Sequence, residues 1–474
     1  MLKAISKLLG KDTIARGAMI VMFSSVLTGV VTFALMPLWT YFLSPEEFGL
    51  FGLVQASAGL VQGIVGLGIY AAMGRFVHDD LHNEHHVGSI VSNSIKCTWV
   101  ASALLCCAAA FIVTAYLGGS TDDGQVWLYV LISMVWVWFN VSNSQASALF
   151  VAFEKHHINA IVNITSLLVG SGIAVALVVW ADYGILGRFL GNLAGAGLVG
   201  VVLIYWLIKR YWKYKLEWKT SKAMLVYGAP LIVHTLASIL LAIGDRFVIE
   251  RMIGLQAAGL YTVAYLFGKP LEFLIGAISQ AWSPRYFRQM QNGEEGDKAI
   301  RKFNKYWTLI MVSFVCVATI IAPIIFTWLV EERYQPASPV IAPVIGGLFL
   351  MGVYHLSVGP IYVAKKTHLV ATTTLVSALV NIGANIILVP MYGIVGAAYG
   401  TLISYAMMAV TVTYISKPFH PQFDQVMKLW KWFILVVIFS VIPWAQINIT
   451  WAILTAAALI MVMFMSFKLS EQRN

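Results

Sequence analysis

Charged residues are scarce in this chain of 474 residues. Only 11% of its residues are Asp, Glu, Lys or Arg, whereas about 25% is usual for a soluble domain. Apolar runs of about 20 residues recur from end to end, and each could cross about 30 Å of hydrocarbon as a helix. The sequence therefore predicts an all-α polytopic membrane protein. Continuous runs of this length exclude a transmembrane β-barrel, whose strands alternate between apolar and polar residues.

Cysteine and the common catalytic signatures are also rare. The four cysteines all fall inside apolar runs, which argues against disulfides and zinc sites. The sequence contains no nucleophile elbow, phosphate-binding loop or metal-binding helix motif. The polar segments on the predicted outer side are too short to hold a catalytic domain. We therefore expect no catalytic residues, no metal and no cofactor, and a protein that is not an enzyme.

The apolar runs predict about fourteen transmembrane helices. Their approximate ranges are 17–42, 49–72, 89–116, 126–150, 158–181, 185–208, 225–248, 257–281, 306–330, 340–364, 368–389, 394–416, 430–447 and 450–467. Of the 31 Lys and Arg residues, 25 fall on the predicted inner segments and four on the outer ones. Because cytoplasmic loops are enriched in Lys and Arg, this bias predicts that both termini are cytoplasmic.

Proline occurs inside several predicted spans, where it removes a backbone hydrogen bond and bends the helix. The residues are Pro37, Pro230, Pro270 and Pro360. We expect kinks at these positions, and bending helices could help a cavity to open alternately to the two sides.

The two halves of the chain resemble each other at an offset of about 210 residues. Gly49 and Gly259 lie in similar short motifs, and an arginine follows each of them after 26 residues, at Arg75 and Arg285. A Tyr-Gly-Ile motif at Tyr183 recurs 209 residues later. Six spans per half is an even number, so both halves enter the membrane from the same side. This parallel repeat is typical of some transporters.

The repeat predicts the domain organisation. Residues 1–16 are expected to form a cytoplasmic amphipathic segment, 17–208 an N-lobe of helices 1–6, and 225–416 a C-lobe of helices 7–12. A basic cytoplasmic linker, 209–224, joins the lobes. Residues 417–474 hold two appended helices and a cytoplasmic tail.

The net charge of +10 could indicate a nucleic-acid partner. The linker favours this in isolation, because residues 209–215 interleave basic and aromatic side chains that could stack on nucleotides. Beside a transmembrane span, however, the same pattern is typical of a segment at the anionic headgroup surface. We therefore expect membrane lipids as partners, and no nucleic acid.

Ionisable residues within spans are costly unless they face a cavity or a partner. Lys269 lies deepest, and Glu272 shares its helix face three residues on. Two interpretations remain open for them: a mutually neutralising pair, or a cavity cation with a carboxylate that tunes it or carries a proton. Lys96 could either extend its ammonium group to the inner surface or face the same cavity.

Further arginines are candidates for a cationic substrate cavity. Arg75 and Arg285 occupy equivalent inner ends of spans, as topology anchors or at the inner mouth of the cavity. Arg188 and Arg246 lie on the outer side, against the charge bias. They could bind substrate or pair with a neighbouring acid such as Asp245.

Two histidines lie within spans, at His234 and His355. Such residues are usually hydrogen-bonded packing residues, but imidazole can also act as a protonation switch. Together with Glu272 and Asp245, they are the candidates for ion or proton coupling.

The span plan and several short motifs resemble the polysaccharide-export branch of the MATE-like (MOP) transporter superfamily, and most closely its O-antigen (Wzx-type) flippases. The motifs of the first half are Leu43-Ser44-Pro45-Glu46-Glu47-Phe48-Gly49, Gly66-Leu67-Gly68 and Arg75-Phe76. Those of the second half are Asp245-Arg246, Gly259-Leu260-Tyr261 and Pro284-Arg285.

This resemblance implies a flippase of lipopolysaccharide biosynthesis in the bacterial cytoplasmic (inner) membrane. Such proteins move undecaprenyl-pyrophosphate-linked oligosaccharide, an O-antigen or similar surface glycan unit, from the inner to the outer leaflet by alternating access. The implied partners are the lipid-linked glycan and other glycan-assembly proteins. The alternatives are a lipid II-type flippase, a multidrug or ion antiporter of the same superfamily, and, less favoured, a membrane glycan polymerase.

Overall fold

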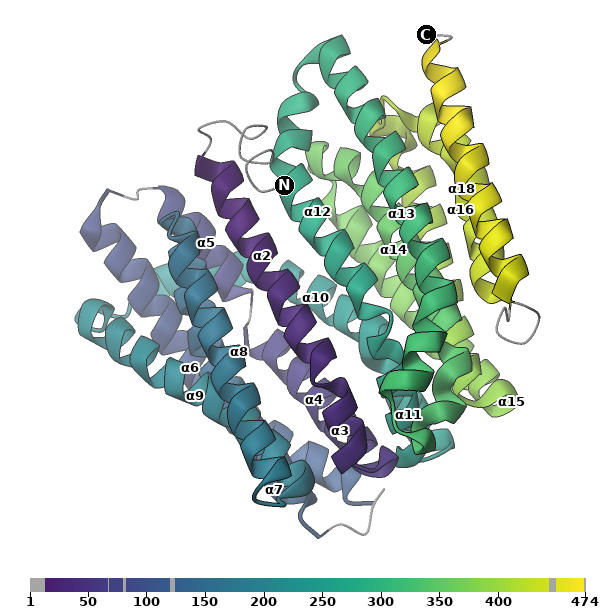
Figure 1. Ribbon diagram of the computed structural model, residues 1–474. Coiled ribbons are helices and arrows are strands. Elements are labelled where there is room, and N and C mark those ends of the chain that lie inside the picture. Colours follow the sequence, from purple (N-terminus) through teal and green to yellow (C-terminus); the bar gives the residue numbers. More distant parts are fainter. Residues whose placement is uncertain (1–12, 67, 80–81, 120–123, 443–448, 473–474) are drawn as a thin grey trace. The chain divides into compact units, whose positions relative to one another are not determined.

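The computed structural model of the protein describes residues 13–66, 68–79, 82–119, 124–442 and 449–472. Almost all of these residues are helical, and no strand occurs in these ranges (Figure 1). The first twelve residues of the predicted amphipathic segment lie outside them. The helices are α2 (Thr13–Ala34), α3 (Met36–Phe42), α4 (Pro45–Val65), α5 (Ile69–Asp79), α6 (Glu84–Leu117), α7 (Val126–Ala152), α8 (His156–Val179), α9 (Gly184–Tyr211), α10 (Trp218–Met252), α11 (Leu255–Leu266), α12 (Lys269–Gln289), α13 (Gly293–Leu329), η1 (Glu332–Val340), α14 (Ile341–Val363), α15 (Thr367–Ser416), η2 (Lys417–Phe419), α16 (Phe423–Val441) and α18 (Ile449–Gln472).

The predicted all-α membrane fold is confirmed. Within the described ranges, 11 helical segments are long and apolar enough to cross a membrane. The remaining predicted spans are α16, the pair α11 and α12, and one half of α15. The long helix α15 holds two spans because Gly393, at φ 61° and ψ −143°, interrupts it. Each of the fourteen predicted spans therefore overlaps a described helix or pair of helices, and the protein is an all-α polytopic membrane protein.

The start of α4 explains one sequence motif. The Ser44 hydroxyl accepts a hydrogen bond from the Glu47 amide at 3.2 Å, and the Glu47 carboxylate accepts one from the Ser44 amide at 2.8 Å. This reciprocal cap satisfies two amides that the first turn leaves unpaired. Pro45, at the first helical position, has no amide hydrogen that would need a partner.

Contacts divide the chain into two compact units. The first comprises Met1–Val31 and Phe42–Leu240, and the second comprises Thr32–Tyr41 and Leu241–Asn474. The short α3 belongs to the second unit, where the Arg333 guanidinium donates hydrogen bonds to the carbonyls of Thr40 and Tyr41 at 2.9 and 2.6 Å. The predicted lobes were defined by the repeat, not by contacts, and they remain a prediction.

The first unit packs around small and apolar residues. Gly191 and Gly195 of α9 lie directly against Ala174 and Ser166 of α8, with no space for side chains between them. Small residues allow such close approach of membrane helices. A second core joins α5, α6, α7, α9 and α10 through Ile69, Met73, Ile90, Leu149, Leu207 and Met224.

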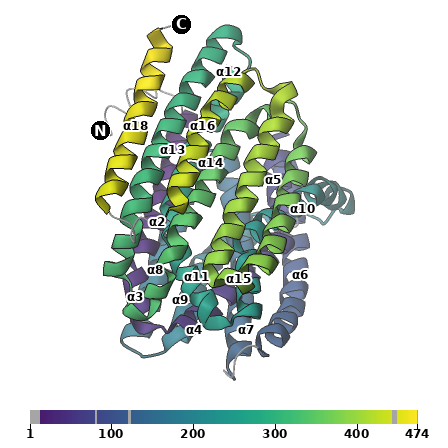
Figure 2. The same cartoon turned by 90° about the vertical axis from the view of Figure 1, so that its right-hand side faces the viewer.

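The second unit is built around α14. This helix contacts α12, α13, α15 and α16 (Figure 2). It also buries a larger share of its span than any other candidate span in the described ranges. Gly268, just before α12, lies so close to α14 that a Cβ there would stand 2.7 Å from Leu348. The unit therefore places the start of α12 directly on its central helix.

Candidate functional site

The second unit contains a buried ion pair near the end of α10. The Arg246 guanidinium lies 3.1 Å from the Asp245 carboxylate. The other carboxylate oxygen of Asp245 accepts hydrogen bonds from the hydroxyls of Tyr261, at 2.5 Å, and Thr401, at 3.2 Å. Tyr261 comes from α11 and Thr401 from α15, so three helices satisfy one carboxylate. A buried charge needs such partners to be tolerated.

A second ion pair lies in the first turn of α12. The ammonium group of Lys269 lies 2.7 Å from the Glu272 carboxylate, and the two side chains are 34% and 38% exposed. Lys269 is the first residue of the helix, Pro270 follows it, and Glu272 lies in the first turn. An acidic group there is favoured by the helix dipole. Of the two interpretations left open by the sequence, the structure contains the neutralising pair, and it leaves both groups accessible.

Tyr265 connects these two pairs. Its ring centroid lies 4.7 Å from the Arg246 guanidinium carbon and 5.8 Å from the Lys269 ammonium nitrogen. An aromatic ring attracts cations within about 6 Å of its centroid. The structure therefore gathers four predicted residues, Asp245, Arg246, Lys269 and Glu272, around one tyrosine. We call these five residues, together with Tyr261 and Thr401, which bind Asp245, the tyrosine cluster.

The sequence contains partial signals for the tyrosine and threonine members of the tyrosine cluster. Tyr261 lies in the motif Gly259-Leu260-Tyr261, the second-half counterpart of Gly49-Leu50-Phe51, and Tyr265 follows it one helical turn later. Thr401 carried no signal, because it lies 156 positions from the carboxylate it contacts. With two cations and two carboxylates, the cluster has no net charge when all four groups are ionised.

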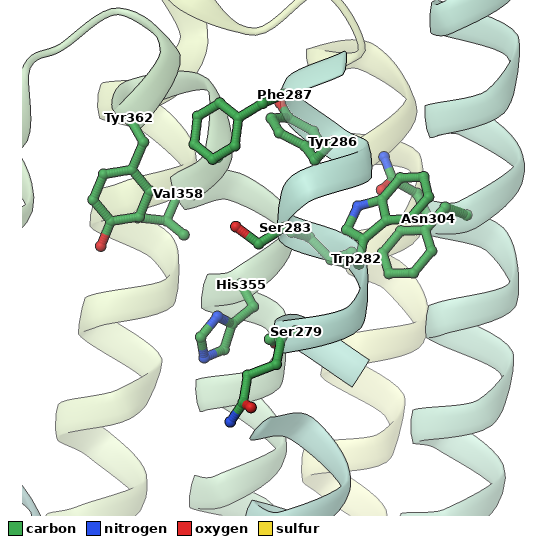
Figure 3. A pocket seen from close by; sticks show the side chains of 13 residues that line it. Ser279, Trp282, Ser283, Tyr286, Phe287, Asn304, His355, Val358 and Tyr362 are labelled. Atoms are coloured by element: carbon green, nitrogen blue, oxygen red, sulfur yellow. The ribbon is translucent and has the colours of Figure 1, made fainter. Parts of the chain in front are cut away.

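A pocket of about 290 Å³ lies between α12, α13 and α14 of the second unit. His355, one of the predicted coupling residues, borders it. Figure 3 shows Ser283 directed toward the space that Tyr362 and His355 border. The lining residues are Ser279, Gln280, Trp282, Ser283, Tyr286, Phe287, Phe303, Asn304, His355, Leu356, Val358, Gly359 and Tyr362. We call this space the α12–α14 pocket.

An aromatic stack forms one wall of the α12–α14 pocket. The rings of Trp282 and Phe303 lie parallel, with centroids 3.8 Å apart and planes 4° apart. Trp307 continues the stack at 5.8 Å from Phe303, and its indole N–H donates to the Gly352 carbonyl at 3.2 Å. Sequence reasoning missed these residues, because aromatic side chains on two separate helices, α12 and α13, form no motif.

In the first unit, Lys96 of α6 binds the end of α9. Its ammonium group donates to the carbonyls of Tyr214, at 2.6 Å, and Trp212, at 3.2 Å. It also lies 5.0 Å from the centroid of the Trp212 ring. A cation at the C-terminus of a helix stabilises the exposed carbonyls there. None of the other predicted site residues takes part in these contacts.

Neighbouring residues of α6 hold the same part of the predicted linker. The Asn93 side-chain oxygen accepts hydrogen bonds from the Glu217 amide, at 2.7 Å, and the Ser221 hydroxyl, at 2.9 Å. The Ser92 hydroxyl donates to the Tyr214 carbonyl at 2.9 Å. The linker is therefore fixed to α6 as an integral part of the first unit.

The other predicted arginines take no part in these contacts. Arg75 on α5 is exposed, and its guanidinium carbon lies 4.9 Å from the Tyr227 ring centroid. Arg285 is exposed on α12. Arg188 on α9 covers two aromatic rings, at 3.8 Å from the centroid of Phe51 and 4.6 Å from that of Phe48.

His234 is half-buried in α10, and its ring Nδ1 has no hydrogen-bond partner among the described residues. Across the described ranges, no group of three or more His, Cys, Asp or Glu residues could hold a metal ion.

A family model of sequences described as polysaccharide biosynthesis proteins matches residues 14–291, more than half of the chain. The chain belongs to this polysaccharide biosynthesis protein family. The predicted resemblance is thereby confirmed. The matched residues include the whole tyrosine cluster except Thr401. The α13 and α14 walls of the α12–α14 pocket lie outside the matched residues.

One relative of this chain is the "Putative O-antigen transporter" of Shigella flexneri. The two are 22% identical over 397 residues, which is 79% of this chain and 90% of the relative.

Two solved structures are similar in fold to this chain. The lipid II flippase MurJ, in an inward closed conformation, has a TM-score of 0.69 at 18% identity, with 96% of this chain and 98% of that chain covered. An inward-facing multidrug resistance MATE family transporter of the MOP superfamily has a TM-score of 0.66 at 14% identity, with 89% and 99% covered. At these identities the likeness establishes the fold, which is that of MOP-superfamily transporters.

Proposed function

We propose that this protein is a flippase for undecaprenyl-pyrophosphate-linked oligosaccharide, an O-antigen or similar surface glycan unit. It moves this substrate from the inner to the outer leaflet of the bacterial inner membrane by alternating access, with both termini in the cytoplasm. The observation that carries the proposal is the family match over residues 14–291. The O-antigen relative, aligned over 90% of its own length, supports the substrate class.

The physical problem is to bring a glycan and a diphosphate through hydrocarbon. Neither group can leave water without compensating hydrogen bonds and charges. A cation that can separate from its own carboxylate partner could compensate the charge of the diphosphate. Lys269 fits this role, because its ammonium group is one-third exposed and is neutralised by a single carboxylate, that of Glu272.

We assign coupling to Glu272. Protonation of its carboxylate would remove the partner of Lys269 and leave one uncompensated cation, which can bind a diphosphate oxygen. Loss of the proton would restore the ion pair and favour release of the substrate. His234, His355 and Asp245 are further coupling candidates. Asp245 is the least accessible of them because four hydrogen bonds from three side chains and one amide satisfy it.

The remaining cations take different roles in this proposal. Arg75 and Arg285 are exposed and lie at equivalent positions of the repeat, so they can meet the headgroup at the inner surface. Lys96 positions the linker, and Arg246 holds the tyrosine cluster. Arg188, which covers two aromatic rings on α9, contacts substrate only if its guanidinium leaves those rings.

A lipid II-type flippase is the second candidate, favoured by the MurJ-like fold over 96% of the chain. Both candidates carry a lipid-linked diphosphate, so the same cation would serve either of them. They differ in the cellular process that fails when the protein is lost.

Deletion of the gene tests the proposal and separates the candidates. We expect loss of surface glycan and accumulation of lipid-linked oligosaccharide on the inner leaflet, both restored by a plasmid copy. Accumulated lipid II with cell lysis would instead support the second candidate. Normal surface glycan with no accumulated intermediate would reject both.

A further inference from the structure

We infer that the α12–α14 pocket receives one sugar ring of the transported glycan. This inference rests on the proposed flippase function and names a subsite for its cargo. The pocket lies within the second unit, and it does not include the tyrosine cluster. The lipid-linked substrate has three chemically different parts, namely a polyprenyl chain, a diphosphate and sugars, and the lining of the pocket selects among them.

Charge excludes the diphosphate. None of the residues that line the α12–α14 pocket is Asp, Glu, Lys or Arg. A diphosphate placed there would lose its hydration without gaining a compensating cation, which is strongly unfavourable. The occupant is therefore an uncharged group.

Unused polar groups exclude the polyprenyl chain. Ser279, Gln280, Ser283 and His355 border the pocket, and their side chains make no hydrogen bond with any described residue. An isoprenoid chain would cover these groups without satisfying them, which is unfavourable for each group that it buries. Sugar hydroxyls, by contrast, both donate and accept hydrogen bonds and can pair with hydroxyl, amide and imidazole groups alike.

The aromatic wall suits the apolar face of a sugar. Trp282 is held flat by the parallel Phe303 ring at 3.8 Å, and Trp307 anchors that stack through its bond to the Gly352 carbonyl. The face of an aromatic ring is electron-rich, so it attracts the weakly positive C–H bonds on one side of a pyranose. Phe287 and Tyr362, 41% and 37% exposed, leave further aromatic surface at the rim.

The size of the pocket limits the occupant to one ring. Its volume of about 290 Å³ lies at the lower end of the roughly 300–1,000 Å³ typical of small-molecule sites. A single pyranose fits this space, and the adjoining sugars of an oligosaccharide would extend past the rim.

Binding to purified protein tests the inference directly. The probes are methyl pyranosides of glucose, galactose, N-acetylglucosamine and rhamnose, observed by saturation-transfer NMR in detergent. Undecaprenyl phosphate, which carries no sugar, serves as the lipid probe. Ser283→Phe fills the pocket from an exposed position on α12, and Trp282→Ala removes the platform. Trp328→Ala, at an 86% exposed tryptophan of α13 outside the pocket, is the matched control.

We expect wild-type protein and Trp328→Ala to bind at least one pyranoside saturably. Ser283→Phe and Trp282→Ala should bind it at least about tenfold more weakly, a change of about 1.4 kcal/mol. Equal thermal unfolding midpoints and monodisperse elution of Ser283→Phe and wild type establish that the loss is local. If Trp282→Ala fails to fold, Ser283→Phe alone decides.

Three results would overturn the inference. These are the absence of saturable pyranoside binding by wild-type protein, unchanged binding by the folded Ser283→Phe variant, and displacement of the pyranoside by undecaprenyl phosphate from this pocket. Glycan export in the complemented deletion strain separates this outcome from the proposed function. Pocket variants that bind and export like wild type reject the subsite alone, whereas normal export without the protein rejects the flippase function itself.

Discussion

Gly68 lies against the backbone of Gly228, with no space for a side chain between them. A Cβ on Gly68 would stand 2.5 Å from the Cα of Gly228, and Gly68 has a φ of +62°. Both restrictions favour glycine, since other residues rarely adopt this backbone conformation. The motif Gly66-Leu67-Gly68 thus has a packing explanation at its third position.

We expect Gly68→Ala to destabilise the protein by at least about 1–3 kcal/mol, because the added methyl group must displace backbone. The measurement is the thermal unfolding midpoint in detergent. Gly74→Ala, in the next helix, is the matched control, since nothing lies within 4 Å of a Cβ there. It should be neutral or slightly stabilising, because alanine has the higher helix propensity. Equal midpoints for Gly68→Ala and Gly74→Ala would contradict the close contact.

The linker should become accessible to protease when the hydrogen bonds between Asn93 of α6 and the linker are removed. Asn93→Ala removes the acceptor for the Glu217 amide and the Ser221 hydroxyl, at a cost of about 1–3 kcal/mol for the donors left unpaired. We expect faster tryptic cleavage at Lys213 and Lys215 in folded protein. Lys302→Met, on the exposed side of α13, provides a control for the digestion. Unchanged cleavage kinetics in Asn93→Ala would mean that the linker is held by other contacts.

The Asp245–Arg246 pair should behave as a structural unit. Arg246→Ala leaves a buried carboxylate without its cation, and we expect a loss of about 3–5 kcal/mol in stability. The double variant Asp245→Asn with Arg246→Met removes both charges and should recover most of this loss. The test compares the unfolding midpoints of wild type, Arg246→Ala and the double variant. A double variant no more stable than Arg246→Ala would argue against a mutually compensating pair.

The Lys269–Glu272 pair should instead control transport. We expect Lys269→Ala to reduce glycan export at least about tenfold, the size of effect that loss of about 1.4 kcal/mol of substrate binding would have if binding limited export. Lys269→Arg should retain part of the activity. Glu272→Gln keeps the cation but removes the carboxylate whose ionisation favours release of the substrate, so export should fall and become insensitive to the pH gradient. The readout is surface glycan in the deletion strain at matched protein levels. Full export by Lys269→Ala would remove this residue from the mechanism.

His420 makes stability depend on pH. It lies between η2 and α16, and burial lowers its pKa from 6.5 to about 4, with a backbone hydrogen bond to Leu356 opposing the shift. Because the unfolded chain binds the proton more tightly, stability is full above pH 6.5 and falls as the pH drops toward 4. Thermal unfolding between pH 8 and pH 4 measures this loss.

We expect His420→Asn, which preserves an acceptor for the Gln422 amide, to lose less stability in acid than wild type. His368→Asn, at an exposed histidine of α15, should follow the wild-type curve. Parallel curves for wild type and His420→Asn would show that other groups cause the acid loss.

Hydropathy alone predicted the membrane helices, because each apolar run must satisfy its backbone internally and can do so only as a helix. The positions at which helices break within a span were harder to predict from the sequence. Pro37 and Pro270 do mark helix starts, at α3 and α12, but Pro360 lies inside an unbroken α14. Proline bends a helix only where its surroundings do not compensate for the missing hydrogen bond.

Local spacing predicted part of the candidate site. The Lys269–Glu272 pair follows from its three-residue spacing on a helix, and Asp245 was a foreseeable partner for Arg246. The binding of Lys96 to the linker was not predictable, because its acceptors lie more than 115 positions away. The same holds for the α12–α14 pocket, which exists only once three helices pack together.

The balance of charge in the tyrosine cluster has an electrical consequence. Two cations and two carboxylates together experience no net force from the membrane potential, whereas one unbalanced charge moved across 100 mV is worth about 2.3 kcal/mol. Protonation of Glu272 would therefore make the cluster sensitive to voltage, and the negative charge of a bound diphosphate would offset that sensitivity. The net charge that moves with the substrate, and hence the effect of the membrane potential on transport, would then depend on the protonation of Glu272.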